Sequence, residues 1–325
     1  MEAFLLLLTL LVCLCCWIPA YHMDVGDWQE GLPATSLWRW ITDFLPSRLS
    51  VFVAGALLLC GIAGLMQYAN YFLILFRERT KLPFCLFLLL NSANYGFIPL
   101  HAASVASFFL IFCMLELFKG YQDGMTPNSA YKALFLLGLG SLFWVHILWL
   151  LPLFWYGMYQ FRLLNLRNII ASLLGIFTLY WMILGVCMWK QDYSIITTAV
   201  QDLTAFNTDL PVELLQVERL AMPLVVFLLM AFFTLYLRFH KFEVGLRTRQ
   251  FVLFLSAIAK YLIPFFILFE NEQSGFLGLF NMPLSLLFTC FCVWADRKHA
   301  TLFYVIFILF FLILWGMQGY RFLSF

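Results

Sequence analysis

The sequence carries very little charge. Only 11% of its 325 residues are Asp, Glu, Lys or Arg, whereas ordinary soluble domains carry about 25%. A water-soluble core does not hide the 64% of residues that are hydrophobic, so we predict an all-α, multi-pass membrane protein. The apolar runs extend over roughly 20 residues, the length of a bilayer-spanning helix. They lack the short alternating pattern of a transmembrane barrel, and this excludes that class.

The motifs of well-known soluble active sites are missing as well. The sequence contains no GxSxG, P-loop, GxGxxG or HExxH motif. Its net charge is only +2, and no basic run is long enough to predict a nucleic-acid partner. The expected partners are therefore the lipid bilayer, a polyprenyl-linked or other lipid substrate, and other membrane proteins.

No cysteine lies in the predicted outer segments, which excludes a disulfide framework. The nine cysteines stand at positions 13, 15, 16, 60, 85, 113, 187, 290 and 292, all inside predicted spans. We interpret them as small apolar packing residues. A metal or redox cluster at Cys13, Cys15 and Cys16 is the alternative, but no His or acid stands at ligand spacing.

The first apolar run has no Lys or Arg before it, and Glu2 is its only charge. A cleavable signal peptide usually begins with a basic region. We therefore expect this run to be a retained first helix.

Apolar stretches and charged clusters alternate along a single transmembrane domain, 1–325. The predicted helical stretches are 3–20, 50–76, 82–118, 133–161, 168–188, 220–237, 250–269, 276–294 and 301–317. Thirteen of the 19 Lys and Arg residues fall in 77–81, 119–132, 162–167, 238–249 and 295–299. Because cytoplasmic loops are rich in these residues, we predict a cytoplasmic N-terminus in a bacterial inner membrane, with 21–49 and 189–219 outside.

Two of the stretches are too long for one helix and have a polar centre. Residues 82–118 contain "NSANYGFIPLH" at 91–101, and residues 133–161 contain "HILWLLP" at 146–152. Gly and Pro break helices, and both flanks of 82–118 are basic. We favour two helical hairpins, which gives 11 helical segments, and the alternative with single crossings gives 9.

The two longest polar segments each contain an expected interfacial helix. In "TSLWRWITDFLP", 35–46, apolar residues recur at helical spacing and the Trp residues suit the membrane surface. Residues 208–220 have an Asp cap and a Pro in the first turn, which is typical of a helix start.

Asp24 and Asp27 are the candidate catalytic residues. They follow the first helix, beside His22. Carboxylates spaced in this way suit a divalent cation, or one of them suits a general base acting on a polyprenyl-linked substrate. A solvated acidic loop is the alternative.

The polar turns supply candidate binding residues. His101, His146, Asn94 and Tyr95, together with Asn91, are predicted to lie at the same outer level as the two aspartates. Turns whose polar atoms bond to one another are the alternative.

Lys260 is the third candidate, as an anion or phosphate contact. It lies 11 residues past Arg249, about 16 Å deep at 1.5 Å per residue. A charge at the bilayer centre costs about 2.5–3.5 kcal/mol, so we expect Lys260 to face inward, toward a partner or water. Glu116 needs no such role, because Lys119 stands one turn away.

The stretch "FIPLHAASVASFFLIFCMLELF" and the stretch from "NSAYKALF" to "NIIASLLGIF" lie between residues 97 and 177. In their hydrophobicity and punctuation they resemble an uncharacterised family of multi-pass membrane proteins of Bacteroidota. More distantly, the layout resembles membrane-embedded C-type glycosyltransferases and polysaccharide polymerases. That resemblance implies a catalytic acid in the first outer loop, at Asp24 or Asp27.

The best functional prediction is an envelope-glycan or lipid-linked sugar transferase. A transporter or flippase for an amphiphile is the alternative, with 91–101 and Lys260 as a midplane site. A non-catalytic scaffold or assembly factor is a third.

Cysteine labelling with a membrane-impermeant reagent tests the orientation. Single cysteines at positions 27, 95, 207 and 124 are placed in a cysteine-free background. We expect the first three to react from outside and position 124 to react only after lysis. Labelling of position 124 from outside would instead mean that 82–118 crosses once.

Overall fold

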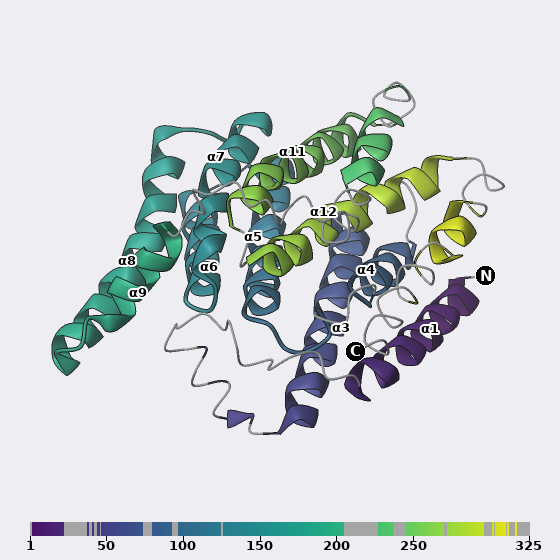
Figure 1. Ribbon diagram of the computed structural model, residues 1–325. Coiled ribbons are helices and arrows are strands. Elements are labelled where there is room, and N and C mark those ends of the chain that lie inside the picture. Colours follow the sequence, from purple (N-terminus) through teal and green to yellow (C-terminus); the bar gives the residue numbers. More distant parts are fainter. Residues whose placement is uncertain are drawn as a thin grey trace.

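In the computed structural model the protein is a bundle of α-helices (Figure 1). The structure describes residues 2–22, 47–73, 80–92, 97–124, 126–204, 227–236, 245–269, 272–295 and 303–309, with isolated positions between them. The helices are α1 (Glu2–His22), α3 (Arg48–Leu73), α4 (Leu82–Ser92), α5 (Ala102–Asp123), α6 (Pro127–Ser141), the 3-10 helix η2 (Val145–Leu150), α7 (Leu151–Gln160), α8 (Leu166–Lys190), α9 (Ser194–Thr204), α11 (Leu246–Leu268) and α12 (Gln273–Trp294). Residues Phe227–Tyr236 form a further short helix. No strand occurs in the described parts, which confirms the predicted all-α class.

Four of the described helices are long and apolar enough to cross a membrane: Arg48–Phe72, Ala102–Tyr121, Leu166–Lys190 and Gly275–Trp294. They agree with the class of protein predicted from composition. Because lipid offers the backbone no hydrogen-bond partner, a helix is the form in which such segments satisfy their own peptide groups.

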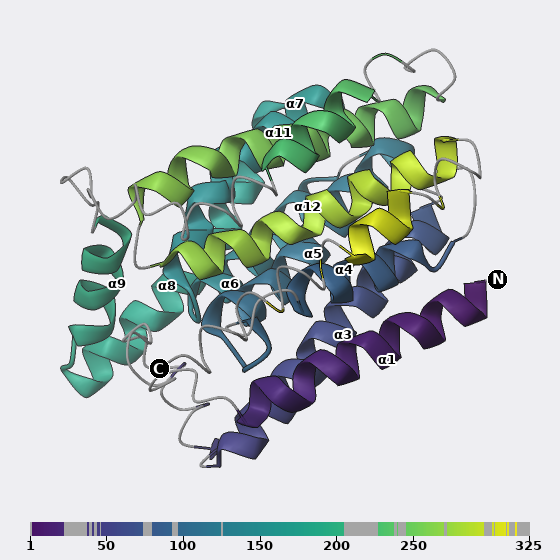
Figure 2. The same cartoon turned by 45° about the vertical axis from the view of Figure 1, so that its right-hand side comes forward.

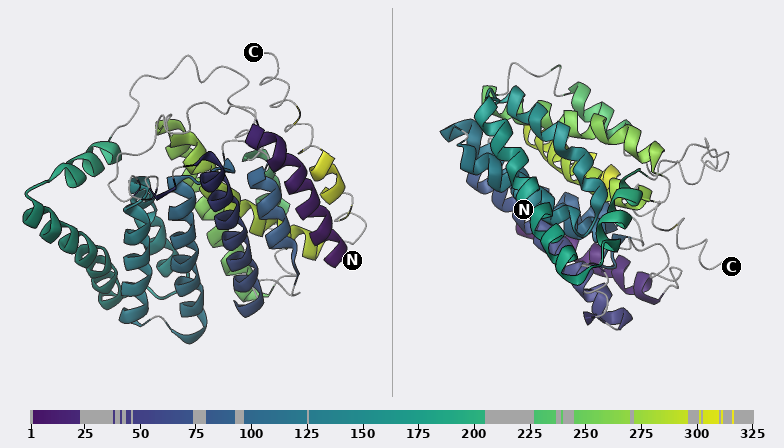
Figure 3. Two further views of the ribbon diagram at one scale, coloured as in Figure 1. Left: turned by 90° about the horizontal axis from the view of Figure 1, so that it is seen from below. Right: turned by 90° about the vertical axis from the view of Figure 1, so that its left-hand side faces the viewer.

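The helices form a row, on which the C-terminal helices pack. α8 contacts α6, α6 contacts α5, α5 contacts α3, α3 contacts α4, and α4 contacts α1. Figure 3 (left) shows this order running from α8 at one edge to α1 at the other. α12 lies across α4 and α5, and α11 packs on α12 (Figure 2). α12 is therefore the central helix: 83% of its apolar window is buried inside the protein, compared with 17% for α8.

Residues 82–118 are broken at the expected place, but into unequal helices. α4 ends at Ser92 and α5 begins at Ala102. α4 has 11 residues, a length of about 16 Å, which is half of a hydrocarbon core. α5 has 22 residues and is long enough to cross. The polar linker 119–132 is also mostly helical, since α5 continues to Asp123 and α6 begins at Pro127, with the Thr126 side chain capping it.

The turn between α4 and α5 packs directly against Gly55 of α3. The backbone at Ile98–Leu100 lies so close to Gly55 of α3 that any Cβ there would overlap it. In this position the Leu100 N–H donates to the Val51 carbonyl at 3.2 Å. The turn therefore gains a backbone partner that lipid would not supply.

The second long stretch is broken at His146, as expected, and the break is the helix η2 between α6 and α7. α6 is held against α8 at Gly175, where a Cβ would overlap the backbone of Tyr131. Close approach at a small residue is the usual way helices associate in membranes. The predicted ion pair of Glu116 and Lys119 is present at 3.4 Å.

Most of the two expected interfacial helices, 35–46 and 208–220, lies outside the described residues. The outer segment 189–219 does contain a described helix, α9. The Asp192 carboxylate caps its start by accepting from the Ser194 N–H at 3.0 Å. α9 packs on η2.

Replacing Gly55 with Ala tests the close approach. We expect Gly55→Ala to destabilise the protein by about 1–3 kcal/mol, the usual cost of overpacking, because the backbone at 98–100 has to move. Gly61→Ala on the same helix is the control, since no atom of another described element lies within 4 Å of its Cβ position. Thermal unfolding in detergent measures both, and equal midpoints would contradict the contact.

Candidate functional site

The structure places four of the eight residues proposed from sequence, and one of them is Asn91, buried in α4. Asp24, Asp27, Asn94 and Tyr95 lie outside the described residues, so their roles stay predictions. Lys260 lines a groove on α11, His146 is buried on η2, and His101 precedes α5.

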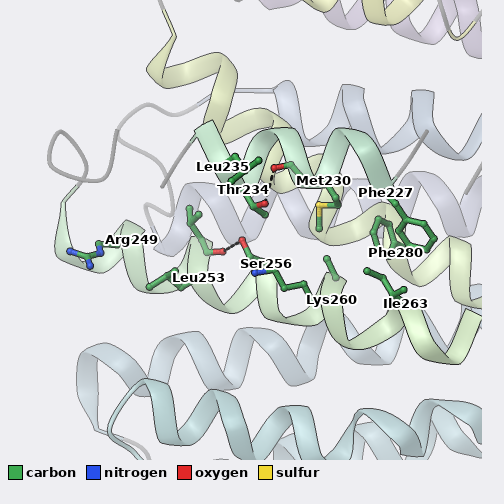
Figure 4. A pocket seen from close by; sticks show the side chains of 13 residues that line it. Phe227, Met230, Thr234, Leu235, Arg249, Leu253, Ser256, Lys260, Ile263 and Phe280 are labelled. Atoms are coloured by element: carbon green, nitrogen blue, oxygen red, sulfur yellow. Dashed lines mark hydrogen bonds between the residues drawn. The ribbon is translucent and has the colours of Figure 1, made fainter. Parts of the chain in front are cut away.

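The groove lies between α11 and the helix Phe227–Tyr236 and has a volume of ≈ 690 Å³. Figure 4 shows Arg249 at one end, Phe227 and Phe280 at the other, and Ser256 and Lys260 between them. The Ser256 hydroxyl donates to the Val252 carbonyl at 2.8 Å. This leaves its oxygen lone pairs able to accept from a ligand.

The sequence predicts that Lys260 faces the interior. In the structure its side chain is instead exposed on this groove. Within the described chain, no carboxylate lies within ion-pair distance of its ammonium. A Lys stem packs along apolar walls while its charge stays in a polar opening. The expectation of an inward-facing Lys260 beside a partner or water is therefore corrected to an exposed Lys260 on an open groove.

A second group of polar residues meets at the opposite end of α11 from Arg249. The Trp144 indole N–H donates to the Glu272 carboxylate at 2.8 Å. Trp144 is fully buried and packs over Gly275, where a Cβ would overlap its ring. His146 lies beside it, with ring centroids 5.5 Å apart, and Asp202 of α9 reaches His146 through its backbone. We call Trp144, His146, Asp202 and Glu272 the outer cluster.

Two atoms of the outer cluster lack a hydrogen-bond partner in the part of the chain that the structure describes. They are His146 Nδ1 and Asp202 Oδ2, and both are buried. His146 is only 4% exposed. Buried polar atoms are almost always paired, so an unpaired imidazole nitrogen and an unpaired carboxylate oxygen in one cluster require an explanation.

Burial changes the acidity of every titratable group in the outer cluster. It lowers the pKa of His146 to about 4, against a smaller opposing effect from the backbone of Asp202. Burial also raises the pKa of Glu272, the Trp144 hydrogen bond opposes this, and the nearby Asp202 charge adds to it. The pKa of Asp202 is raised by burial too. The cluster therefore favours a neutral imidazole and disfavours charged carboxylates.

The same end of α12 also brings the starts of α5 and η2 together. A Cβ on Gly275 would contact both Ala103, two residues after His101, and Trp144, two residues before His146. Burial lowers the pKa of His101, and its Nδ1 has no partner among the described residues. Asn91 of α4 instead bonds within the core, where it accepts from the amide of Asn281 in α12 at 3.2 Å, so its partner does not belong to the other polar turn.

Sequence reasoning missed Asp202, Glu272 and Trp144. Nothing in the spacing of these residues connects them, because 58 positions separate Trp144 from Asp202 and 70 separate Asp202 from Glu272. The described residues contain no group of three or more His, Cys, Asp or Glu side chains placed to hold a metal ion. The possible divalent cation at Asp24 and Asp27 lies outside them.

Comparison with protein-family models, curated proteins and solved structures finds no match for this chain. The resemblances to a Bacteroidota membrane family and to C-type glycosyltransferases therefore stay predictions.

The lowered pKa of His146 predicts acid sensitivity. Folding favours the neutral ring, so stability is lost as pH falls from about 6.5 in the unfolded chain toward about 4. A shift of this size is equivalent to about 3 kcal/mol at most. We expect His146→Phe to make the melting temperature depend less on pH in this range. Replacement of the exposed His22 by Phe should leave the dependence unchanged. Identical profiles for all three proteins would contradict the burial of a neutral ring.

Proposed function

We propose that the protein binds an anionic amphiphile, a lipid or lipid-linked phosphate, in the α11 groove and moves it along the groove within the membrane. The observation that carries the proposal is the pair of cations, Arg249 and Lys260, on one open, otherwise largely apolar groove. They are separated by about 16 Å along the helix, half of a hydrocarbon core. An anionic head contacts the cations while its chain lies against the apolar walls.

The lining of the groove favours binding and movement over chemical transfer. It contains Arg, Lys, Ser and Thr but no Asp, Glu or His among the described residues. A transfer reaction usually needs a general acid or base near the reacting atoms. The hydroxyls of Thr234 and Ser256 and the two cations offer contacts to a head group instead.

The orientation predicted from charge supports the proposal. With the N-terminus in the cytoplasm, Arg249 lies at the cytoplasmic end of α11 and the outer cluster lies at the other. The half-length α4 supports a first hairpin with one short leg. The second hairpin at 133–161, the count of 11 segments and the bacterial inner membrane remain parts of this proposal.

A second candidate function is the envelope-glycan or lipid-linked sugar transferase. It is favoured by the outer cluster, where two carboxyl groups and an imidazole meet on the predicted outer side. Asp24 and Asp27 are proposed to lie on that same side. In this case the groove holds the lipid-linked donor, and an acid of the outer face acts as the base. The proposed scaffold or assembly factor needs neither site.

Replacement of Lys260 tests the first proposal. We expect Lys260→Met to slow the movement of a fluorescent phosphatidylglycerol between the leaflets of reconstituted vesicles by about tenfold or more. The reason is that a charge-assisted contact is worth about 1.5–3 kcal/mol. Lys132→Met, at an exposed position on α6, is the matched control. Quenching of the outer-leaflet dye measures the rate.

The outcomes separate the candidates. Equal rates for wild type and both variants would reject movement through the groove. Loss of a glycan product on joint replacement of Asp24 and Asp27 by Asn, with lipid movement absent, would favour the transferase. If neither effect is observed, the scaffold or assembly factor is the function that remains.

A further inference from the structure

We propose that the outer cluster is a proton-binding site, in which Glu272 takes up a proton from the outer solution beside Asp202 and His146. The proton site does not depend on the proposed function. Only the further step, that the bound proton accompanies the anionic amphiphile, rests on it. The ligand is a proton and not a larger molecule, for reasons of geometry and charge.

The first reason is that every unpaired atom in the outer cluster can act as an acceptor. The Asp202 carboxylate accepts. His146 Nδ1 is buried without a partner among the described residues, and in a neutral ring that carries its proton on the other nitrogen this atom is an acceptor. Glu272 already receives one hydrogen bond, from Trp144 at 2.8 Å. The Trp144 N–H is already used by Glu272, so the remaining acceptors of the cluster are complementary to a proton.

The second reason is that the described elements around the outer cluster supply no compensating cation. The elements that meet here are η2, α9, the starts of α5 and α12, and the end of α11, where residues 261–269 contain no Lys or Arg. Their titratable His, Asp and Glu groups are His146, Asp202, His101 and Glu272, and neither η2, α9 nor the first two turns of α5 and α12 contain Lys or Arg. Two carboxylates without a cation repel each other, and one added proton relieves that repulsion.

The third reason is packing. Trp144, His146, Phe269 and Phe276 are in ring contact, with centroid separations of 4.7 to 6.0 Å. Rings packed in this way leave little room for an organic ligand, whereas a proton needs no cavity. Burial also raises the pKa of Glu272, which agrees with the inference.

The position of the site suggests its use. Glu272 stands at the start of α12, and α12 packs on α11, the helix that carries Lys260. Glu272 lies at the end of α11 opposite Arg249. One proton entering with one monovalent anion leaves no net charge to cross the bilayer. Protonation of Glu272 also weakens the hydrogen bond from Trp144, the residue before η2, and so changes the contact between η2 and α12.

Infrared titration of the purified protein tests the site directly. We expect a carboxyl band that titrates in the pH range above that of an ordinary Glu, because burial raises the pKa of Glu272. Glu272→Gln should remove the band, and Trp144→Phe, which keeps the carboxyl, should move its frequency and midpoint. Asp192→Asn, at an exposed cap on the same outer segment, should leave it unchanged. If no band titrates in this range in wild type, or if the band persists in Glu272→Gln, the proton site is rejected.

Vesicle flux at two pH values tests the coupling. Faster movement of the anionic lipid with acid outside, lost in Glu272→Gln but kept in Asp192→Asn, supports it. Flux that is equal at both pH values, in a protein whose band titrates, rejects the coupling. A titrating band without any flux in wild type rejects the proposed function and leaves the proton site standing, so the two failures are distinguishable.

Discussion

The structure depends on the need to satisfy backbone polar groups where lipid offers no partner. Regular helices meet this need by themselves, but the breaks after α4 and after α6 do not. The turn at 97–101 rests on α3 at Gly55 and bonds to the Val51 carbonyl. The break after α6 closes into its own 3-10 helix, η2, beneath α9. Both breaks are therefore sheltered by neighbouring helices.

The same sheltering creates the two candidate sites. η2 turns Trp144 and His146 toward the start of α12, where Gly275 gives the indole space and Glu272 accepts its hydrogen bond. On another side, the short helix Phe227–Tyr236 lies beside the Lys260 face of α11, and the described residues leave a groove open there. One site offers cations on apolar walls, and the other offers acids and an imidazole without a cation. An anionic amphiphile and a proton are the ligands that complement these two surfaces.

The sequence by itself determined the all-α fold and the places where the long apolar stretches break, and it predicted the membrane class with which four long apolar helices agree. The fold class follows from the composition and the length of the apolar runs. The breaks follow from the positions of Gly, Pro and Asn, because these residues affect the backbone locally. It also singled out Lys260, His101 and His146, because polar groups in an apolar stretch are costly wherever they point.

Only the tertiary structure decided which way those residues point and what they meet. Lys260 faces an open groove because Phe227–Tyr236 lies beside it, and a periodicity argument does not include that neighbour. Glu272 joins His146 and Asp202 because α9, η2 and α12 pack at one end of the bundle. Contacts across 58 and 70 positions depend on how helices pack, and helix packing is set by small residues such as Gly275 and Gly55 that carry no chemical signal of their own.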